Sequence, residues 1–259
     1  KLIPGVEAIF TYEDVPNTRF TLAGQTYPEP SAYDALILDP VVRYVGDEVA
    51  LIVAKDEATA LKAMPLIKVE YEVQKPVLDL RTAMDHETVV HPEDDILNHI
   101  PVGQDYKRNI CVSYHKRVGD IEGELAKCDY VVEGTYFDQA TRQSAMEPFQ
   151  SFGYIDHLGR IVIVSSTQIV FHVRRHIARA LGIPASKIRV IKPRIGGGFG
   201  SKQTACTELM TAFVTWKLQK PCYLLYDRTE AQTCSTTRHA REWYIRVGAT
   251  KDGIIQVID

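Results

Sequence analysis

Ile195-Gly196-Gly197-Gly198-Phe199-Gly200-Ser201-Lys202-Gln203 is the stretch that decides the fold, because it sets four glycines in five positions between a strand pattern and a helix pattern. The apolar residues of 187–191 predict the strand, and the spacing of apolar residues over 203–216 predicts the helix. Glycines without a Cβ let backbone amides approach a ligand and adopt positive φ, and a following helix N-terminus adds N–H donors. The stretch therefore indicates a loop that binds an anionic or oxo ligand.

Three interpretations of this loop compete. A phosphate-binding P-loop counted from Gly196 requires glycine at position 201, where Ser201 stands, and Ser or Thr at position 203, where Gln203 stands. A dinucleotide-binding GxGxxG motif counted from the same glycine also fails at Ser201. A tight connection without a ligand remains open, but each glycine costs up to about 1 kcal/mol of ordering entropy relative to alanine. Four of them favour a ligand.

Working outward, the patterns alternate between strands and helices, which predicts a mixed α/β (α+β) fold. In the N-terminal part we expect a strand over 48–54, a helix over 57–63 with Asp56 as its N-cap, and a strand over 68–73. In the C-terminal part we expect a helix over 120–127, strands over 130–136, 151–155 and 161–165, a helix over 170–181, and strands over 222–226, 243–247 and 254–258.

The expected domain organisation has three parts. Residues 1–75 form a small α/β domain, residues 76–112 form an extended linker rich in proline and acidic residues, and residues 113–259 begin a second domain. The chain has no initiator methionine and ends on the short apolar run 254–258, so we expect both domains to be cut off, the first at its N-terminus and the second at its C-terminus.

Composition and charge exclude several classes of protein. The chain is 45% hydrophobic and 24% charged with a net charge of -3, which gives no reason to expect nucleic acid or an anionic membrane as partner. No apolar run approaches the roughly 20 residues of a membrane span. The five scattered cysteines include no CxxC pair, so neither a disulfide framework nor a zinc or iron–sulfur site is indicated, and a cytoplasmic location is expected.

The glycine loop resembles the GGGFGxK loop of the xanthine dehydrogenase and aldehyde oxidase family of molybdenum hydroxylases. The resemblance extends over the whole chain and is closest to bacterial xanthine dehydrogenase. Further matching segments are Val42–Ala50 and Val69–Glu72 in the small domain called the hammerhead, Met146-Glu147-Pro148, Ser165-Ser166-Thr167-Gln168, Arg174–Pro184 and Thr237-Arg238-His239. The resemblance implies a hammerhead-like domain followed by part of a molybdenum-cofactor-binding domain.

In that family a molybdenum ion on a pterin, in plain or cytosine dinucleotide form, hydroxylates an electron-poor carbon with oxygen from water. The electrons leave through 2Fe-2S clusters to FAD on partner subunits or domains. The resemblance implies that Gln168, Gly198, Phe199 and Gly200 bind the cofactor, with Gln168 and Phe199 in the environment of the molybdenum. Taken alone, Gln168 would be read as a sheet-edge polar residue and Phe199 as a core aromatic.

Gln203 stands where animal xanthine dehydrogenases carry a substrate-facing glutamate, so it is the expected substrate-binding residue. A neutral amide can pair with the donor and acceptor edge of a purine, but it cannot stabilise a protonated ring. Glu147 is assigned a structural role near the cofactor. No catalytic residue is expected in this chain, because the family's glutamate base lies beyond residue 259, and the isolated piece is expected to be inactive.

Two histidines, His172 and His176, lie four residues apart on one predicted helix. That spacing suits chelation, but no third ligand is evident, so surface or capping roles are expected. The sequence thus favours part of a hydroxylase acting on purines such as xanthine or hypoxanthine. Alternatives are an aldehyde or nicotinate-type N-heterocycle hydroxylase of the same family, and a non-catalytic binding module that retains the fold.

Overall fold

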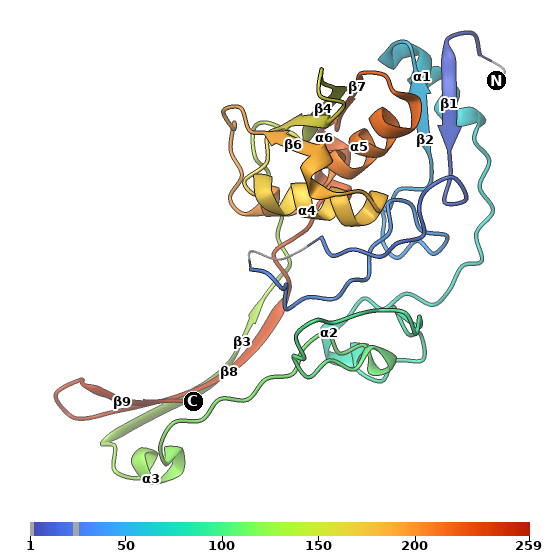
Figure 1. Cartoon of the computed structure of the whole chain (residues 1–259). Helices are drawn as coiled ribbons and strands as arrows, with labels where there is room; N and C mark the ends of the chain where they lie inside the picture. The colour runs from blue at the N-terminus through green and yellow to red at the C-terminus, as the bar shows by residue number, and fades with distance from the viewer. Residues whose placement is uncertain (1–2, 23–25) are drawn as a thin grey trace.

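The computed structural model describes residues 3–22 and 26–259, and in this part of the chain the fold is mixed α and β with three separate sheets (Figure 1). The largest sheet has the strand order β6-β5-β4-β7. Its strands are β4 (Gln150–Ile155), β5 (Ile161–Ser165), β6 (Ile188–Ile191) and β7 (Cys222–Leu225).

The central strands of this sheet follow from local signals. Strands β4 and β5 form an antiparallel hairpin in which Ser151 pairs with Ser165, and Gly159 turns the chain at positive φ. Helix α4 (Val170–Leu181) then carries the chain to β6, which lies parallel to β5. Gly182 ends the helix in the left-handed conformation, as its position predicts. These strands and this helix are confirmed.

Helix α5 (Thr207–Leu218) begins later than the sequence predicts. A 3-10 turn spans Ser201–Gln203, and Thr204 is extended, so the helix predicted to start at position 203 starts at Thr207. The Glu208 side chain accepts a hydrogen bond from the Cys206 amide at 2.9 Å and thereby satisfies a donor at the helix start.

The N-terminal part is built on two paired strands and one helix. Strand β1 (Val6–Phe10), which the sequence analysis did not predict, pairs antiparallel with β2 (Leu51–Ala54). Asp56 accepts a hydrogen bond from the Thr59 amide and caps α1 (Glu57–Ala63), as predicted. The strand expected over 68–73 is wrong. That segment has no ladder partner and is mostly exposed.

The middle of the chain is largely irregular. It contains α2 (Leu80–Ala83), a 3-10 turn (Tyr106–Arg108) and α3 (Ile121–Leu125), the helix expected over 120–127, whose N-cap is Asp120. The division into residues 1–75, 76–112 and 113–259 stays a prediction.

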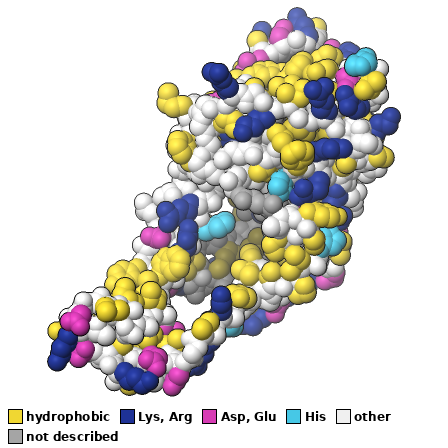
Figure 2. All heavy atoms as spheres, turned by 60° about the vertical axis from the view of Figure 1, so that its left-hand side comes forward, with side chains coloured by type: hydrophobic (Ala, Val, Ile, Leu, Met, Phe, Trp, Pro, Cys, Tyr) yellow, Lys and Arg dark blue, Asp and Glu magenta, His cyan; other side chains and the backbone are white. Residues whose placement is uncertain are grey.

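A long antiparallel ribbon extends away from the main body (Figure 1). Strand β3 (Tyr130–Asp138) pairs with β8 (Arg241–Ala249) from Tyr130–Ala249 to Asp138–Arg241, and β9 (Ile255–Ile258) joins the outer edge of β8. Many of its apolar side chains are exposed, including those of Val132, Trp243 and Ile258. Figure 2 shows such side chains together with charges of both signs over this protruding part.

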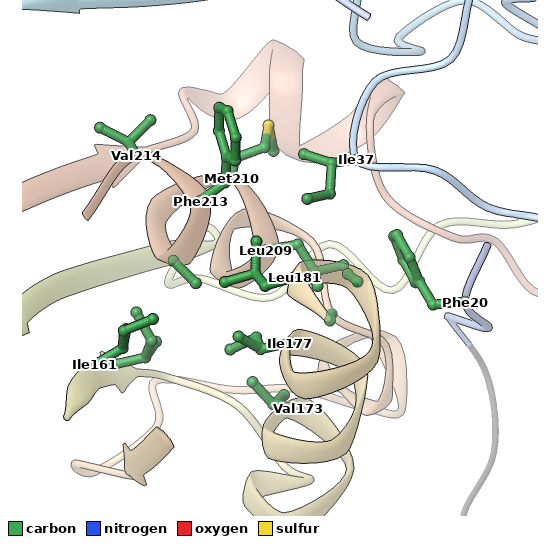
Figure 3. Close-up of a cluster of buried hydrophobic side chains, with 14 of the residues drawn as sticks. Phe20, Ile37, Ile161, Val173, Ile177, Leu181, Leu209, Met210, Phe213 and Val214 are labelled. Atoms are coloured by element: carbon green, nitrogen blue, oxygen red, sulfur yellow. The ribbon is translucent and has the colours of Figure 1, made fainter. Parts of the chain in front are cut away.

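The core lies between the main sheet and helices α4 and α5. Its members include Ile161, Val173, Ile177, Leu209 and Phe213, which point toward one another in Figure 3. The same cluster also takes Phe10, Phe20, Ile37 and Leu38 from the N-terminal part, so the described chain has one continuous core. The ring of Phe10 packs edge-on against Phe213 with centroids 5.1 Å apart.

A further short helix, α6 (Arg228–Thr233), was not predicted, although the Asp227-x-x-Glu230 pattern before and within it forms a capping box. Within residues 3–22 and 26–259, no helix is long and apolar enough to cross a membrane.

Replacing Phe213 with alanine should lower the free energy of unfolding by about 3–5 kcal/mol, because the ring is fully buried and its loss leaves a cavity. Urea denaturation measures the change. Phe171→Ala on α4 is the control, since that ring is 70% exposed and its removal should cost far less. Equal losses for the two variants would show that the core is not centred on α5.

Candidate functional site

The glycine loop crosses from the end of β6 to the 3-10 turn in an unusual backbone conformation. Gly197, Phe199 and Gly200 all have positive φ, and the Phe199 side chain is 77% exposed. In the described chain the amides of Gly197, Gly198, Phe199 and Gly200 donate no hydrogen bond to protein. Four consecutive N–H groups in such a turn can bind an anionic or oxo ligand.

Gln168 lies beside this loop although it is 30 residues away in sequence. It sits in the connection between β5 and α4, and its amide donates to the Lys202 carbonyl at 2.9 Å. A Cβ added at Gly198 would lie 2.6 Å from the Gln168 Oε1 atom, so the side chain passes directly over the glycine. The side-chain carboxamide of Gln168, unlike its backbone amide, makes no hydrogen bond within the described residues, and Gln168 is exposed.

Gln203 lies at the far end of the loop. Its amide donates to the Gly200 carbonyl at 3.1 Å, and its side chain is half-buried. The structure thus brings Gln168 and Gly198 into contact, with Phe199 and Gly200 next in the chain. The roles of these residues and of Gln203 toward a cofactor or substrate stay predictions.

A buried carboxylate that the sequence did not predict, that of Glu208, links the segment before Gln168 to the start of α5. Glu208 in the first turn of α5 is 5% exposed and accepts a hydrogen bond from the Ser165 hydroxyl at 2.6 Å. Burial raises the pKa of Glu208 above its ordinary value, although the hydrogen bonds from the Ser165 hydroxyl and the Cys206 amide partly oppose this shift. The contact ties the end of β5, three residues before Gln168, to the start of α5. The sequence signal that could have indicated this carboxylate is an acidic residue in the first turn of an otherwise apolar helix.

Of the two histidines of α4, His172 is partly exposed, whereas His176 differs from the expected surface or capping role. His176 is 3% exposed, and both of its ring nitrogens lack a hydrogen-bond partner in the described chain. Burial lowers its pKa to about 4, although nearby Glu29 opposes the shift, so the ring is neutral near pH 7. The surface role expected for His176 is wrong. No set of three or more His, Cys, Asp or Glu residues in the described ranges is placed to hold a metal ion.

A cavity of about 690 Å³ lies between the N-terminal part and the segment that follows the loop. Thr204, Ala205 and Cys206 line one side of it, and Glu48 lines the other; Gln168 and Phe199 do not line it. The Tyr226 hydroxyl donates to Glu48 at 2.6 Å. Burial raises the pKa of Glu48 to about 7, although the Tyr226 bond lowers it.

The fold and the glycine loop define a candidate ligand-binding domain, and comparison with known proteins identifies its family. Residues 102–259 match the molybdopterin cofactor-binding domain, and residues 1–75 match the a/b hammerhead domain of aldehyde oxidase and xanthine dehydrogenase. The chain therefore belongs to the molybdopterin cofactor-binding domain family. This confirms the hammerhead-like and cofactor-binding fold, and with it the resemblance stated from the sequence.

Individual relatives agree with the family. The chain is 36% identical over 280 residues to a probable hypoxanthine oxidase from Escherichia coli, covering 99% of this chain and 29% of that protein. It is 35% identical over 260 residues to a putative xanthine dehydrogenase molybdenum-binding subunit from the same species, covering 98% of this chain and 33% of that protein. The chain thus spans about a third of the length of these relatives.

Among solved structures, the aldehyde oxidoreductase of Desulfovibrio gigas superposes on 99% of this chain and 27% of its own chain with a TM-score of 0.81. The sequence identity is 24%, so this likeness supports the fold alone.

The raised pKa of Glu48 predicts a pH dependence of stability. Between its ordinary pKa of 4.5 and about 7, the folded protein binds more protons at this site than the unfolded chain, so stability falls as pH rises through that range. Glu48→Gln keeps the acceptor for Tyr226 without the charge. It should raise the free energy of unfolding at pH 8 by an amount on the order of 1–3 kcal/mol and change it little at pH 4.

Denaturation at both pH values measures this effect, with the exposed Glu13→Gln as control. An equal change from Glu48→Gln at pH 4 and pH 8 would contradict the assignment of the charge penalty to Glu48.

Proposed function

We propose that this chain forms the cofactor-binding portion of a molybdenum hydroxylase that oxidises purines such as hypoxanthine and xanthine with oxygen from water. One observation carries the proposal. The side-chain carboxamide of Gln168 lies against Gly198, one of four consecutive loop residues whose backbone amides donate no hydrogen bond within the described chain. Such donors suit the molybdenum–pterin cofactor of the family, whose oxo ligands and phosphate accept hydrogen bonds.

The residues present fit a molybdenum–pterin group. Its oxo ligands and phosphate are hydrogen-bond acceptors, and the amides from Gly197 to Gly200 are donors that no protein group in the described chain uses. Gly198 has no side chain to fill the space that Gln168 crosses.

Each residue then has a defined task. Gln168 presents both a donor and an acceptor, so it can hold an oxo group or a bound water without adding charge. The Gly198, Phe199 and Gly200 amides would donate to the same group from the loop, and the exposed Phe199 side chain would lie next to it in the chain. The bound cofactor would supply the Lewis acid and the two-electron acceptor that oxidation of carbon by water requires.

Gln203 supports a substrate with a donor and acceptor edge. A primary amide offers both groups in one plane, as a purine edge does, whereas an aldehyde presents a single acceptor. The similarity to a probable hypoxanthine oxidase favours the same class. If Gln203 does not contact the substrate, the alternative substrate is an aldehyde or a nicotinate-type heterocycle. If the protein binds no metal, the alternative is a non-catalytic binding module.

We also propose partners for the electrons. The family's 2Fe-2S clusters and FAD would lie on partner subunits or domains, because no CxxC pair occurs in the chain and its five cysteines are free. Free thiols also fit a reducing, cytoplasmic location.

The contact between Gln168 and Gly198 gives a testable cycle. Gln168→Ala should lower kcat of the native protein on the order of 10²–10³-fold, as removal of one positioned donor does. Gly198→Ala should act similarly, because its Cβ would displace the flexible end of Gln168 while leaving the fold intact. The double variant should be no worse than either single variant. Fully additive losses would show that the two residues act separately.

Substrate class and metal content decide the proposal as a whole. The native protein, isolated with its partner subunits, is analysed for molybdenum and assayed with hypoxanthine, xanthine, nicotinate and an aldehyde using a dye acceptor. We expect stoichiometric molybdenum and fastest turnover of a purine. Preference for nicotinate or the aldehyde would overturn the purine assignment, and absence of molybdenum would leave the binding module.

A further inference from the structure

One carboxylate holds both ends of the glycine loop. Glu147 Oε2 accepts from the Gly196 amide at 2.6 Å and from the Lys202 ammonium at 2.8 Å. Its other oxygen accepts from the Gln150 side chain at 2.8 Å, and its own amide donates to the Gly196 carbonyl at 3.1 Å. Gly196 at the start of the loop and Lys202 at its end therefore both bind the Glu147 side chain.

Burial makes the ion pair between Glu147 and Lys202 costly to break. The Lys202 side chain is 2% exposed and its ammonium forms an ion pair with Glu147, while the buried Glu208 carboxylate also interacts with this charge. Burial tends to raise the pKa of Glu147, but the bonds from Lys202, Gly196 and Gln150 outweigh it and lower the pKa. A Cβ on Gly196 would lie 2.7 Å from the Glu147 Cβ atom, so the loop approaches this residue as closely as its backbone permits.

The same lysine also anchors Gln168. The Lys202 carbonyl accepts the Gln168 amide at 2.9 Å, so a shift of Lys202 would move the backbone of Gln168 as well as the loop. Glu147 therefore contacts the glycine loop at Gly196 and at Lys202, and it is linked to Gln168 through Lys202.

We propose that Glu147 is a positioning residue that sets the shape of the glycine loop before any ligand binds. In this role the ion pair with Lys202 fixes the end of the loop, and the hydrogen bonds with Gly196 fix its start. The consequence for cofactor retention rests on the proposed function. The competing explanation is an ordinary buried ion pair that stabilises the fold without shaping the loop.

Three variants of the native protein separate the two explanations. Glu147→Gln leaves a buried, unpaired Lys202 charge, so it should lower the melting temperature and loosen the loop. Lys202→Met leaves Glu147 able to accept from Gly196. The double variant Glu147→Gln/Lys202→Met removes both charges of the pair, so its melting temperature should lie closer to that of the wild type than the melting temperature of Glu147→Gln does, while the Gly196 amide is held only by a neutral carboxamide.

The readout is hydrogen exchange of the peptide covering 195–203, whose Gly196, Ser201 and Gln203 amides are hydrogen-bonded. These amides should exchange about tenfold faster in Glu147→Gln and in the double variant, as expected for loss of one charge-assisted bond. Molybdenum content should fall in the same two variants. Glu124→Gln, which breaks an exposed pair with Lys127, is the control and should change neither quantity.

Wild-type exchange of the loop in the double variant would overturn the proposal, because the pair would then act on stability alone. Wild-type exchange in Glu147→Gln would overturn it too. If the wild-type protein holds no molybdenum, the proposed function fails, but loop exchange still decides whether Glu147 positions the loop.

Discussion

Burial of helix α5 on every side is the constraint on which the rest of the structure depends. Nine consecutive residues from Thr207 to Thr215 are buried, a pattern that no single sheet face can satisfy. The main sheet and α4 cover part of the helix, and Phe10 of β1 covers another part. The N-terminal strands are therefore held against the second family domain by the same core that holds that domain together.

A helix fixed in this way also fixes where the glycine loop can lie. Its first turn carries Glu208, whose carboxylate binds the Ser165 hydroxyl at the end of β5. The connection after β5 and the loop before α5 must then run side by side, and this brings Gln168 to Lys202 and Gly198. An uncompensated carboxylate at this depth would be costly, so the polar contact and the apolar burial of α5 depend on each other.

Elements with signals inside their own sequence could be predicted, and elements that depend on distant partners could not. Helix α4 is confirmed because its apolar spacing and Gly182 are local. The strand expected over 68–73 is wrong because alternation alone supplies no neighbouring strand, and β1 was missed because its partner lies some 40 residues away. At the site, the glycine run indicated a ligand loop from local chemistry. The pairing of Gln168 with it came only from the family resemblance, because no sequence pattern encodes a contact across 30 residues.

The described side of the site offers hydrogen bonds and almost no charge. The Lys202 ammonium is neutralised by Glu147, and Gln168, Gln203 and the loop amides are neutral. Neutral donors attract a ligand weakly over distance, so recognition must come from geometry rather than from electrostatic steering. Geometry contributes only if the donors already converge before binding, since ordering a loose loop would cost free energy at each residue. A loop built largely of glycine has the most freedom to lose, and this explains why its two ends are tied to one buried ion pair.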